Sequence, residues 1–248
     1  MIDPTRYETM RAIHDQATRE NSELGVVITP VSLSADRNTI LPVEAALGYT
    51  VAQHLFFGSG PHVAVEGCSD FVFLTQMSEH LVANGRIGLD PRVSIIPVGG
   101  IGNMPAFVAL MGRRLDVRAL VDGAETARVI SKVRNAAKAV GMPEDRVVVI
   151  GEVNGLSATA DIEDLFTVKD YLWLYSRAVE PIAEANLPAT PEPILRRLAV
   201  ARPQKGQEEA FDHALPAHEL TAMRTDFFGQ VDTATLDRFE EVFRLLRP

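Results

Sequence analysis

Four short, almost continuously apolar runs lie in the middle of the chain, and segments with helical spacing separate them. The runs cover residues 63–66, 93–98, 117–121 and 147–150. The intervening segments predict helices at about 70–83, 103–112 and 125–140. Strands that are apolar throughout are typical of a sheet that is buried on both faces. The alternation therefore predicts an α/β fold with about four parallel strands and helices on both faces of the sheet.

The pattern before this core is weaker. Tyr7, Met10, Ile13 and Ala17 have helical spacing and predict an amphipathic helix over residues 5–20. Residues 26–28 then predict a short strand. Within residues 40–57, Pro42 is expected to begin a second helix, which Gly48 interrupts or ends. Residues 1–60 are accordingly interpreted as a leading arm, with the α/β core at 61–176.

The part after the core is predicted to be helical. Residues 161–166 lead into a helix that includes Tyr171 and Leu174, and residues 186–193 form a connector rich in proline and alanine. Asp232 or Thr233 is expected to cap a final helix. Residues 177–248 are therefore interpreted as a helical C-terminal region.

Acidic residues stand where the predicted strands end. Glu66 follows the first strand, Asp70 lies at the start of the next helix with Ser69 or Asp70 itself as the possible cap, and Asp122 follows the third strand. Glu163 and Asp164 belong to a further acidic motif. Open α/β sheets bind ligands outside the carboxyl ends of their strands, and Mg²⁺ takes oxygen ligands. Each acid alone is better explained as a cap or a solvated loop residue, but the set favours a metal site.

The stretch Val65-Glu66-Gly67-Cys68-Ser69-Asp70 resembles the first motif of the Toprim (topoisomerase–primase) domain. Two further stretches, residues 96–100 and 161–166, are similar to nucleases of the overcoming-lysogenisation-defect (OLD) family. The resemblance covers roughly residues 61–175. It implies a Rossmann-like Toprim core and metal-dependent DNA cleavage. It also implies that Glu66, Asp70, Asp122 and Glu163 bind Mg²⁺ or Mn²⁺, with two such ions in a complete site. It also implies that Glu66 acts in proton transfer.

The sequence departs from the family pattern at one position. Toprim domains carry Asp-x-Asp after a later strand, and here the second Asp is replaced by Ala124. Glu125 is the substitute ligand available at the next position. OLD-like nucleases also use a late lysine to stabilise transition-state charge, for which Lys205 is the first candidate and Lys169 the second. A solvated surface lysine explains Lys205 equally well.

Basic residues cluster near the predicted acidic site. Arg128 and Lys132 lie on the helix after Asp122, and Arg202 lies near Lys205. These residues are candidates for contacts with a DNA backbone, although a charged helix face is usually only a solvated one. Since OLD-like proteins carry an ATPase ahead of this domain, the resemblance implies an ATPase partner in cis or in trans. We also expect a homodimer.

Two other functions stay open. A degenerate Toprim domain would bind nucleic acid or a partner without cutting, and Ala124 favours this alternative. A nucleotide- or dinucleotide-binding enzyme would use the turn Gly100-Ile101-Gly102-Asn103-Met104-Pro105. Pro105 replaces the third glycine of that fingerprint, so we interpret the turn as a tight strand-to-helix connection beside the acidic site.

Composition and charge further narrow the possible functional classes of the protein. The 248 residues carry a formal charge of −9, which is not that of a general polyanion binder. The single cysteine, Cys68, excludes internal disulfides and cysteine-rich zinc sites, and fits a reducing cytoplasm. We see no secretory signal, no apolar run long enough to span a bilayer, and no P-loop. We therefore expect a cytoplasmic protein that does not itself hydrolyse ATP.

Overall fold

A computed structural model describes residues 60–112, 115–123, 127–202, 212 and 214–247 of the chain. The backbone of residues 11–15 and 26–30 is also described.

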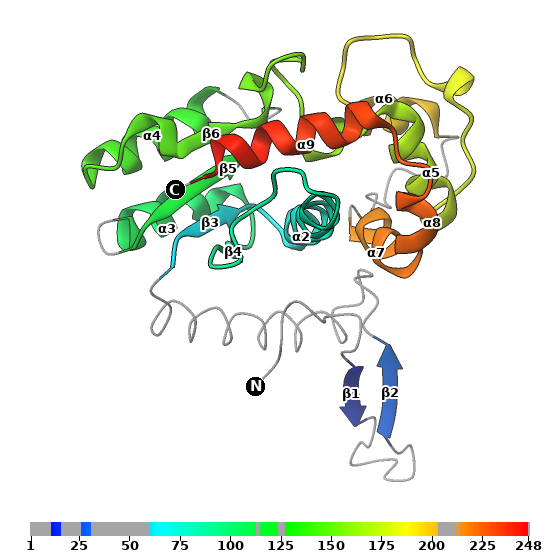
Figure 1. Cartoon of the computed structure of the whole chain (residues 1–248), viewed down its shortest axis with the longest axis horizontal. Coiled ribbons are helices and arrows are strands. Elements are labelled where there is room, and N and C mark those ends of the chain that lie inside the picture. The colour runs from blue at the N-terminus through cyan, green and yellow to red at the C-terminus, as the bar shows by residue number, and fades with distance from the viewer. Residues whose placement is uncertain are drawn as a thin grey trace, which may run out of the picture.

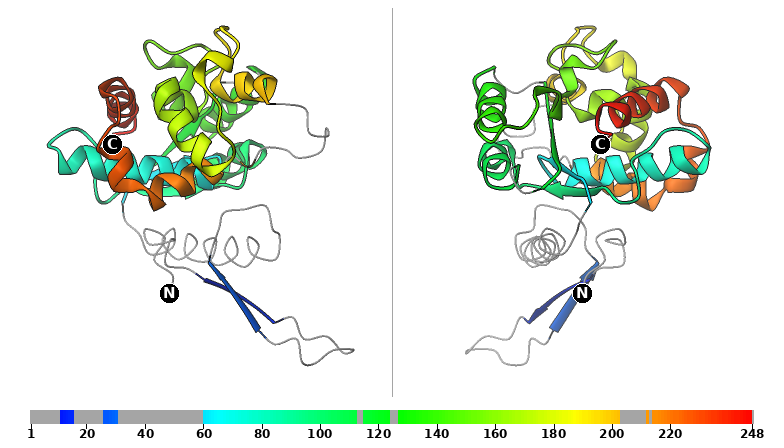
Figure 2. Two further views of the ribbon diagram at one scale, coloured as in Figure 1. Left: turned by 90° about the vertical axis from the view of Figure 1, so that its right-hand side faces the viewer. Right: turned by 60° about the vertical axis from the view of Figure 1, so that its left-hand side comes forward.

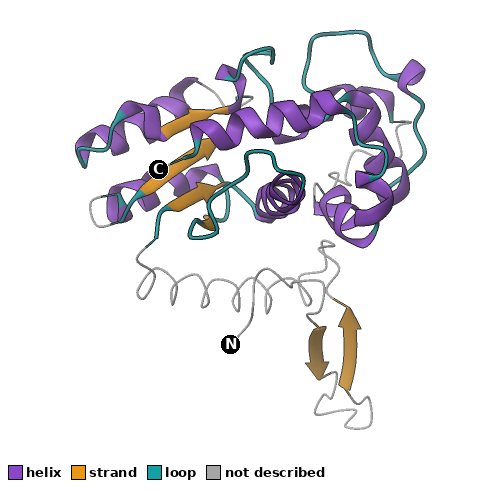
Figure 3. Ribbon diagram, in the orientation of Figure 1, coloured by secondary structure: helices purple, strands orange, loops and turns teal. Residues whose placement is uncertain are grey.

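One sheet of four parallel strands forms the centre of the molecule (Figures 1 and 3), in the order β4-β3-β5-β6. His62 pairs with Ser94 on one side and Val117 on the other, and Ala119 pairs with Val147. Every residue of β3, β5 and β6 is buried, as their apolar sequences predict. The strands are β3 (His62–Val65), β4 (Ser94–Pro97), β5 (Val117–Val121) and β6 (Val147–Val149).

Helices cover both faces of this sheet, and each face has its own hydrophobic core. Val65 and Leu120 face the core that includes α2 (Cys68–Ala83), whereas Ala64 and Val121 face the core with α3 (Met104–Met111) and α4 (Ala127–Ala139). Figure 2 shows α3 and α4 on the side of the sheet opposite to α2 and α9. The predicted α/β fold with helices on both faces is confirmed.

The path of the chain across the sheet changes direction between β3 and β5. After β3 the chain crosses through α2 to β4 at one edge, whereas after β5 it crosses through α4 to β6 at the other edge. Neighbouring strands that lead to opposite sides in this way form a topological switch point, where open α/β sheets bind their ligands. Glu66 and Asp122 directly follow these two strands.

The residues after β6 form helices and short 3-10 turns that pack on the α2 side. The ring of Phe166 lies 5.0 Å from Phe73 of α2 and 4.9 Å from Phe239 of α9, both edge to face. Such contacts add to the burial of apolar area and fix the later helices against the sheet layer. The helices are α5 (Val168–Ala178), α6 (Ile194–Ala201), α7 (Ala214–Ala222), α8 (Arg224–Phe228) and α9 (Thr233–Leu245). In the described part of the chain, the 3-10 turns are η2 (Ile101–Asn103), η3 (Glu144–Arg146), η4 (Ile150–Glu152), η5 (Ile162–Leu165) and η6 (Glu184–Asn186).

The helix predicted over residues 5–20 is wrong. Residues 11–15 form β1 (Arg11–Asp15), which pairs antiparallel with β2 (Val26–Pro30). The helical spacing of a few apolar residues did not reveal this pairing, because the partner strand lies farther along the chain. The strand predicted at residues 26–28 is confirmed within β2. The helix predicted at 40–57 lies outside the described residues.

Two predicted helix starts have different outcomes. The final helix has Asp232 as its N-cap, whose carboxylate accepts a hydrogen bond from the Ala234 N–H at 2.9 Å, as predicted. The helix expected to be capped at Ser69 or Asp70 instead has Gly67 as its N-cap. Asp70 occupies the third helical position, and its carboxylate accepts from the Gly67 N–H at 2.9 Å.

A buried threonine hydroxyl joins the starts of α5 and α9. Thr235 donates to the fully buried carboxylate of Asp170 at 2.5 Å and accepts from the Thr167 N–H at 2.8 Å.

We expect Thr235→Val, which keeps the shape of the side chain, to lower the free energy of unfolding by about 2 kcal/mol, since Asp170 and Thr167 each lose a buried hydrogen bond. Urea denaturation measures this loss. Thr233→Val, at the exposed first residue of α9, is the control and should change the value by less than about 0.5 kcal/mol; equal losses would contradict the assignment.

Candidate functional site

The acids that follow β3 and β5 are in direct contact. The backbone N–H of Asp122 donates to Oε1 of Glu66 at 3.1 Å. Both residues are partly buried. The parallel pairing of β3 with β5 places their carboxyl ends side by side. The structure therefore brings together two of the predicted ligands, at the switch point of the sheet.

Asp70 joins them from the first turn of α2. Its side chain is buried, with 7% of its surface exposed. Burial, the largest effect, and the charge of Glu163 together raise the pKa of the Asp70 carboxyl to about 7, against the opposing effect of the hydrogen bond from the Gly67 N–H.

The segment after β6 completes the acidic group. The N–H of Ile162 in η5 donates to Oδ1 of Asp122 at 3.1 Å, and Glu163 next to it is 3% exposed. Burial, and then the charges of Asp70, Glu163, Glu66 and Asp161, raise the pKa of Asp122 well above its ordinary value. We call Glu66, Asp70, Asp122, Asp161 and Glu163 the acidic cluster. It combines residues from three separate parts of the chain.

Two glycines allow the segment before η5 to approach so closely. A Cβ on Gly123 would lie 2.7 Å from the Ala158 carbonyl oxygen and 2.8 Å from that of Ala160. A Cβ on Gly151 would collide with the Ala158 backbone. The Gly123 N–H donates to the Ala160 carbonyl at 2.8 Å. The backbone around Asp122 is therefore packed directly against the segment that carries Asp161 and Glu163.

The glycine turn after β4 lies beside the acidic cluster. Gly99 and Gly100 have φ angles of +78° and +105°, which only glycine adopts readily, and the Gly100 N–H donates to the Glu66 carbonyl at 2.7 Å. This agrees with its interpretation as a tight turn. The strand order argues against a dinucleotide fingerprint, because β3 separates β4 from β5, the strand that Asp122 follows.

The side chains of the acidic cluster are not arranged as a finished metal site. Among the described residues, no three His, Cys, Asp or Glu side chains are placed so that they could hold one metal ion. The carboxylates of Glu66, Asp70 and Asp122 accept backbone N–H groups. The donor chemistry nevertheless fits Mg²⁺ or Mn²⁺, since the ligands are oxygens and a cation would relieve their mutual repulsion. Binding would require some of these side chains to turn.

The other predicted site residues have different positions. Glu125 and Lys205 lie outside the described residues. Arg128 and Lys132 are exposed on α4, whose start is at the same edge of the sheet as Asp122. Arg202 follows α6, and its Nε donates to Oε1 of Glu180 at 2.9 Å. Of the three predicted DNA contacts, Arg128 and Lys132 are therefore the two that lie exposed on the helix next to the acidic cluster.

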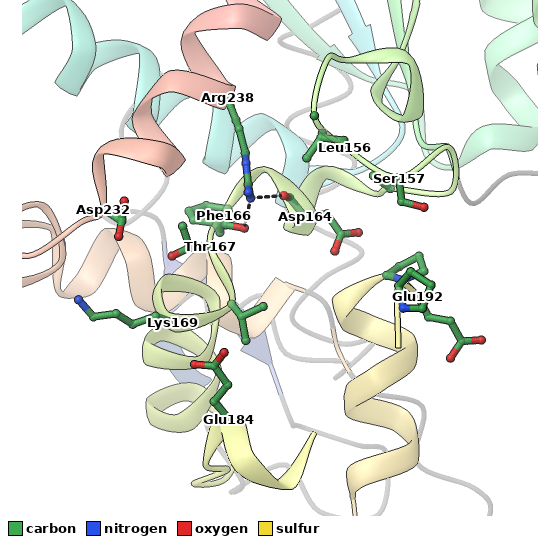
Figure 4. Close-up of a pocket in the computed structure, with 15 residues that line it drawn as sticks. Leu156, Ser157, Asp164, Phe166, Thr167, Lys169, Glu184, Glu192, Asp232 and Arg238 are labelled. Atoms are coloured by element: carbon green, nitrogen blue, oxygen red, sulfur yellow. Dashed lines mark hydrogen bonds between the residues drawn. The ribbon is translucent and has the colours of Figure 1, made fainter. Parts of the chain in front are cut away.

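A separate pocket of about 380 Å³ lies on another side of η5 (Figure 4). Lys169, the second lysine candidate, lines it, and the guanidinium of Arg238 donates to the carbonyls of Asp164 and Phe166 at 3.1 and 3.0 Å. No member of the acidic cluster lines this pocket. Lys169 therefore lines this pocket and not the acidic cluster, and the two hydrogen bonds of Arg238 hold η5 in place.

Sequence reasoning did not separate the roles of the acids in residues 161–166. Asp164 has a structural role, because its Oδ1 accepts from the Ile194 N–H and its Oδ2 from the Asp161 N–H, each at 2.9 Å. Asp161 belongs to the acidic cluster but was not among the candidates. The capping pattern Asp-x-x-Asp was the available signal, since it predicts a cap at Asp161 and a partner at Asp164.

No family model, curated protein or solved structure matches this chain. The resemblance to Toprim and OLD-like proteins therefore has no support from these comparisons. In the described part of the chain, no helix is both long and apolar enough to cross a membrane.

The raised pKa of Asp70 predicts how the metal-free protein responds to pH. The native state keeps this proton up to about pH 7, whereas the unfolded chain releases it near pH 3.8. Between these values the native state binds more protons, so this carboxyl makes stability fall as pH rises. With a chelator present, we expect the melting temperature of the wild type to fall relative to that of Asp70→Asn between pH 5 and about 8. If the difference in melting temperature between the wild type and Asp70→Asn stays constant over this pH range, the raised pKa of Asp70 is contradicted.

Proposed function

We propose that the chain is a metal-dependent endonuclease that hydrolyses DNA phosphodiester bonds. The observation that carries this proposal is the acidic cluster at the switch point between β3 and β5. Burying several like charges together is unfavourable unless a cation or protons balance them. A structural role alone gives no reason to gather them where open α/β sheets bind ligands.

Glu66, Asp70, Asp122 and Glu163 are the residues that would hold Mg²⁺ or Mn²⁺. The bound cation would supply Lewis acidity and neutralise charge on the reacting phosphate. Glu66 would act as the proton acceptor, because its side chain is only partly buried and it directly follows β3, one of the two strands at the switch point. Glu125 is retained as a further ligand and Lys205 as the electrostatic catalyst, both from the sequence.

DNA would be held by positive charge on α4. Arg128 and Lys132 are exposed, and they lie on successive turns at the start of the helix that follows Asp122. Their contribution to binding would depend strongly on salt, as expected for phosphate contacts. An ATPase, in cis or in trans, remains the partner that the resemblance implies, and a homodimer remains an expectation from the sequence.

Cleavage of supercoiled plasmid tests this proposal. Purified protein is incubated with plasmid and Mg²⁺, Mn²⁺ or Ca²⁺, and nicked and linear products are separated on a gel. We expect nicking with Mg²⁺ or Mn²⁺ that a chelator abolishes. Absence of cutting with every metal, by protein whose fold is intact, would overturn the proposal for this chain acting alone. A repeat with an ATPase partner would then test it for the complex.

One observation favours a second candidate, a domain that binds nucleic acid without cutting it. The described acidic side chains form no ready metal site, and Ala124 stands where the family has a ligand. Such a domain would bind DNA equally well with and without divalent cations. Fluorescence anisotropy with labelled DNA, carried out in a chelator and in Mg²⁺, separates the two candidates.

A further inference from the structure

The pocket beside η5 is lined by charges of both signs that do not pair with one another. Lys169 and Arg238 bring positive charge to it, and Glu184 and Glu192 bring negative charge. Among the residues that the structure describes, none of these four side chains takes part in a salt bridge. The pocket therefore offers separated positive and negative groups to a ligand.

Arg238 forms the positive side of the pocket. Its side chain is half-buried, and the hydrogen bonds to the carbonyls of Asp164 and Phe166 both come from Nη1. Nε and Nη2, which form the side edge of the guanidinium, donate to no described residue. This edge matches the paired oxygens of a carboxylate or phosphate. Lys169 adds a second, exposed positive charge from the start of α5.

The negative side of the pocket is formed by the two glutamates. Glu184 and Glu192 are exposed, and Glu192 accepts a hydrogen bond from the Thr190 hydroxyl at 3.4 Å. Pro191 and Pro193 on either side of Glu192 restrict its backbone. In Figure 4 the guanidinium of Arg238 lies at the top of the pocket, whereas Glu184 and Glu192 lie below it. The two signs of charge are therefore on different sides of the pocket.

The two aspartates that line the same pocket already have partners. Both carboxylate oxygens of Asp164 accept backbone N–H groups at 2.9 Å, and Oδ1 of Asp232 accepts the N–H of Ala234. These aspartates serve as caps of local structure, so the glutamates are the acids that a ligand would meet.

We propose that this pocket binds a small zwitterion, with a carboxylate or phosphate group on the side of Arg238 and an ammonium group on the side of the glutamates. An anion alone would be repelled by Glu184 and Glu192, and a cation alone by Arg238. The volume of about 380 Å³ is that of a small-molecule site. The inference goes beyond the proposed function and does not depend on it, because no member of the acidic cluster lines the pocket.

Titration calorimetry with a series of ω-amino carboxylates tests this proposal. The series contains glycine, β-alanine, γ-aminobutyrate and longer homologues, because the length sets how far apart the two charges lie. We expect one member to bind at least about 10-fold more tightly than the carboxylate or the alkylammonium ion of the same length, since each of these lacks one charged hydrogen bond. A matching series of aminoalkyl phosphates shows which oxyanion the Arg238 side prefers.

Variants on the two sides of the pocket place the ligand there. Glu184→Gln combined with Glu192→Gln should weaken binding of the best zwitterion by about 10-fold and leave binding of its carboxylate half unchanged. Arg238→Gln should weaken both the zwitterion and the carboxylate half. Since Arg238 also holds η5, the glutamate variant decides the outcome if Arg238→Gln does not fold. Glu144→Gln is the matched control, because Glu144 is exposed and does not line the pocket.

Three results would overturn the inference. The first is that no zwitterion of either series binds at concentrations up to about 10 mM. The second is equal binding of a zwitterion and its alkylammonium half, which would show only an acidic surface. The third is equal binding of the best zwitterion to the wild type and to the double glutamate variant. All titrations are made without metal or DNA, so their failure leaves the proposed nuclease activity standing, and a failure of plasmid cleavage leaves the zwitterion site standing.

Discussion

Glu66→Gln and Asp122→Asn are each expected to lower Mg²⁺-dependent plasmid cleavage by about 1,000-fold or more, which is roughly 4 kcal/mol of transition-state stabilisation. Both substitutions keep the shape and remove one negative charge from the cation site. The amide oxygen introduced at position 66 can still accept the Asp122 N–H, and the one introduced at position 122 can still accept the Ile162 N–H. The loss would therefore come from the missing charge and not from a collapsed fold.

Asp122→Asn should also change thermal stability, and this effect has the opposite sign to its effect on cleavage. Because burial, and after it the charges of Asp70, Glu163, Glu66 and Asp161, disfavour the ionised form of Asp122, its neutralisation should stabilise the protein in a chelator. Thermal melting would then show Asp122→Asn to be more stable than the wild type but inactive. This combination is expected for a site in which a strained charge arrangement is kept for function.

The control for both measurements is Glu144→Gln. Glu144 is exposed in η3, before the amino end of β6, and so lies away from the carboxyl ends that carry the acidic cluster. We expect wild-type cleavage and stability from this variant. Cleavage that survives both Glu66→Gln and Asp122→Asn would indicate a contaminating nuclease or another site, and the proposed function would be wrong.

The sheet could be predicted from the sequence because each strand has its own local pattern of apolar residues. Residues 117–121 and 147–149 are buried at every position, and a nearly continuous apolar pattern has few alternatives once helices separate the strands. The strand order was not accessible, and it is the order that makes β3 and β5 neighbours and brings Glu66 to Asp122. The acids themselves were visible only as residues after apolar runs.

Other features depend on contacts between distant segments. The hairpin of β1 and β2 is fixed by pairing between residues 11–15 and 26–30, which a helical period at residues 5–20 cannot report. The membership of Asp161 in the acidic cluster depends on how closely residues 157–161 approach Gly123, and the sequence shows only a glycine there. The pocket beside η5 is likewise a property of packing, because Lys169, Glu184 and Arg238 lie in separate parts of the sequence and only the fold brings them together.

Gly123→Ala is expected to have the largest effect on the arrangement of the site. The new Cβ would lie 2.7 Å from the Ala158 carbonyl oxygen, 2.8 Å from the Ala160 carbonyl oxygen and 2.9 Å from Cα of Gly151. All three are backbone atoms, so the clash can be relieved only by moving the 157–161 segment or the end of β5. We expect a loss of about 3 kcal/mol in the free energy of unfolding, at the upper end for overpacking. Urea denaturation measures it.

The same displacement should uncouple η5 from β5. If residues 157–161 move outward, the hydrogen bonds from Gly123 to Ala160 and from Ile162 to Asp122 lengthen together, and Glu163 leaves the acidic cluster. Gly123→Ala should therefore lose the stabilisation by Mn²⁺ that the wild type shows in thermal melting. Gly102→Ala is the matched control, because a Cβ there meets no atom within 4 Å although the residue belongs to the glycine turn beside the cluster. If Gly123→Ala melts and responds to Mn²⁺ as Gly102→Ala does, the close approach of the two backbones is not what holds the acidic cluster together.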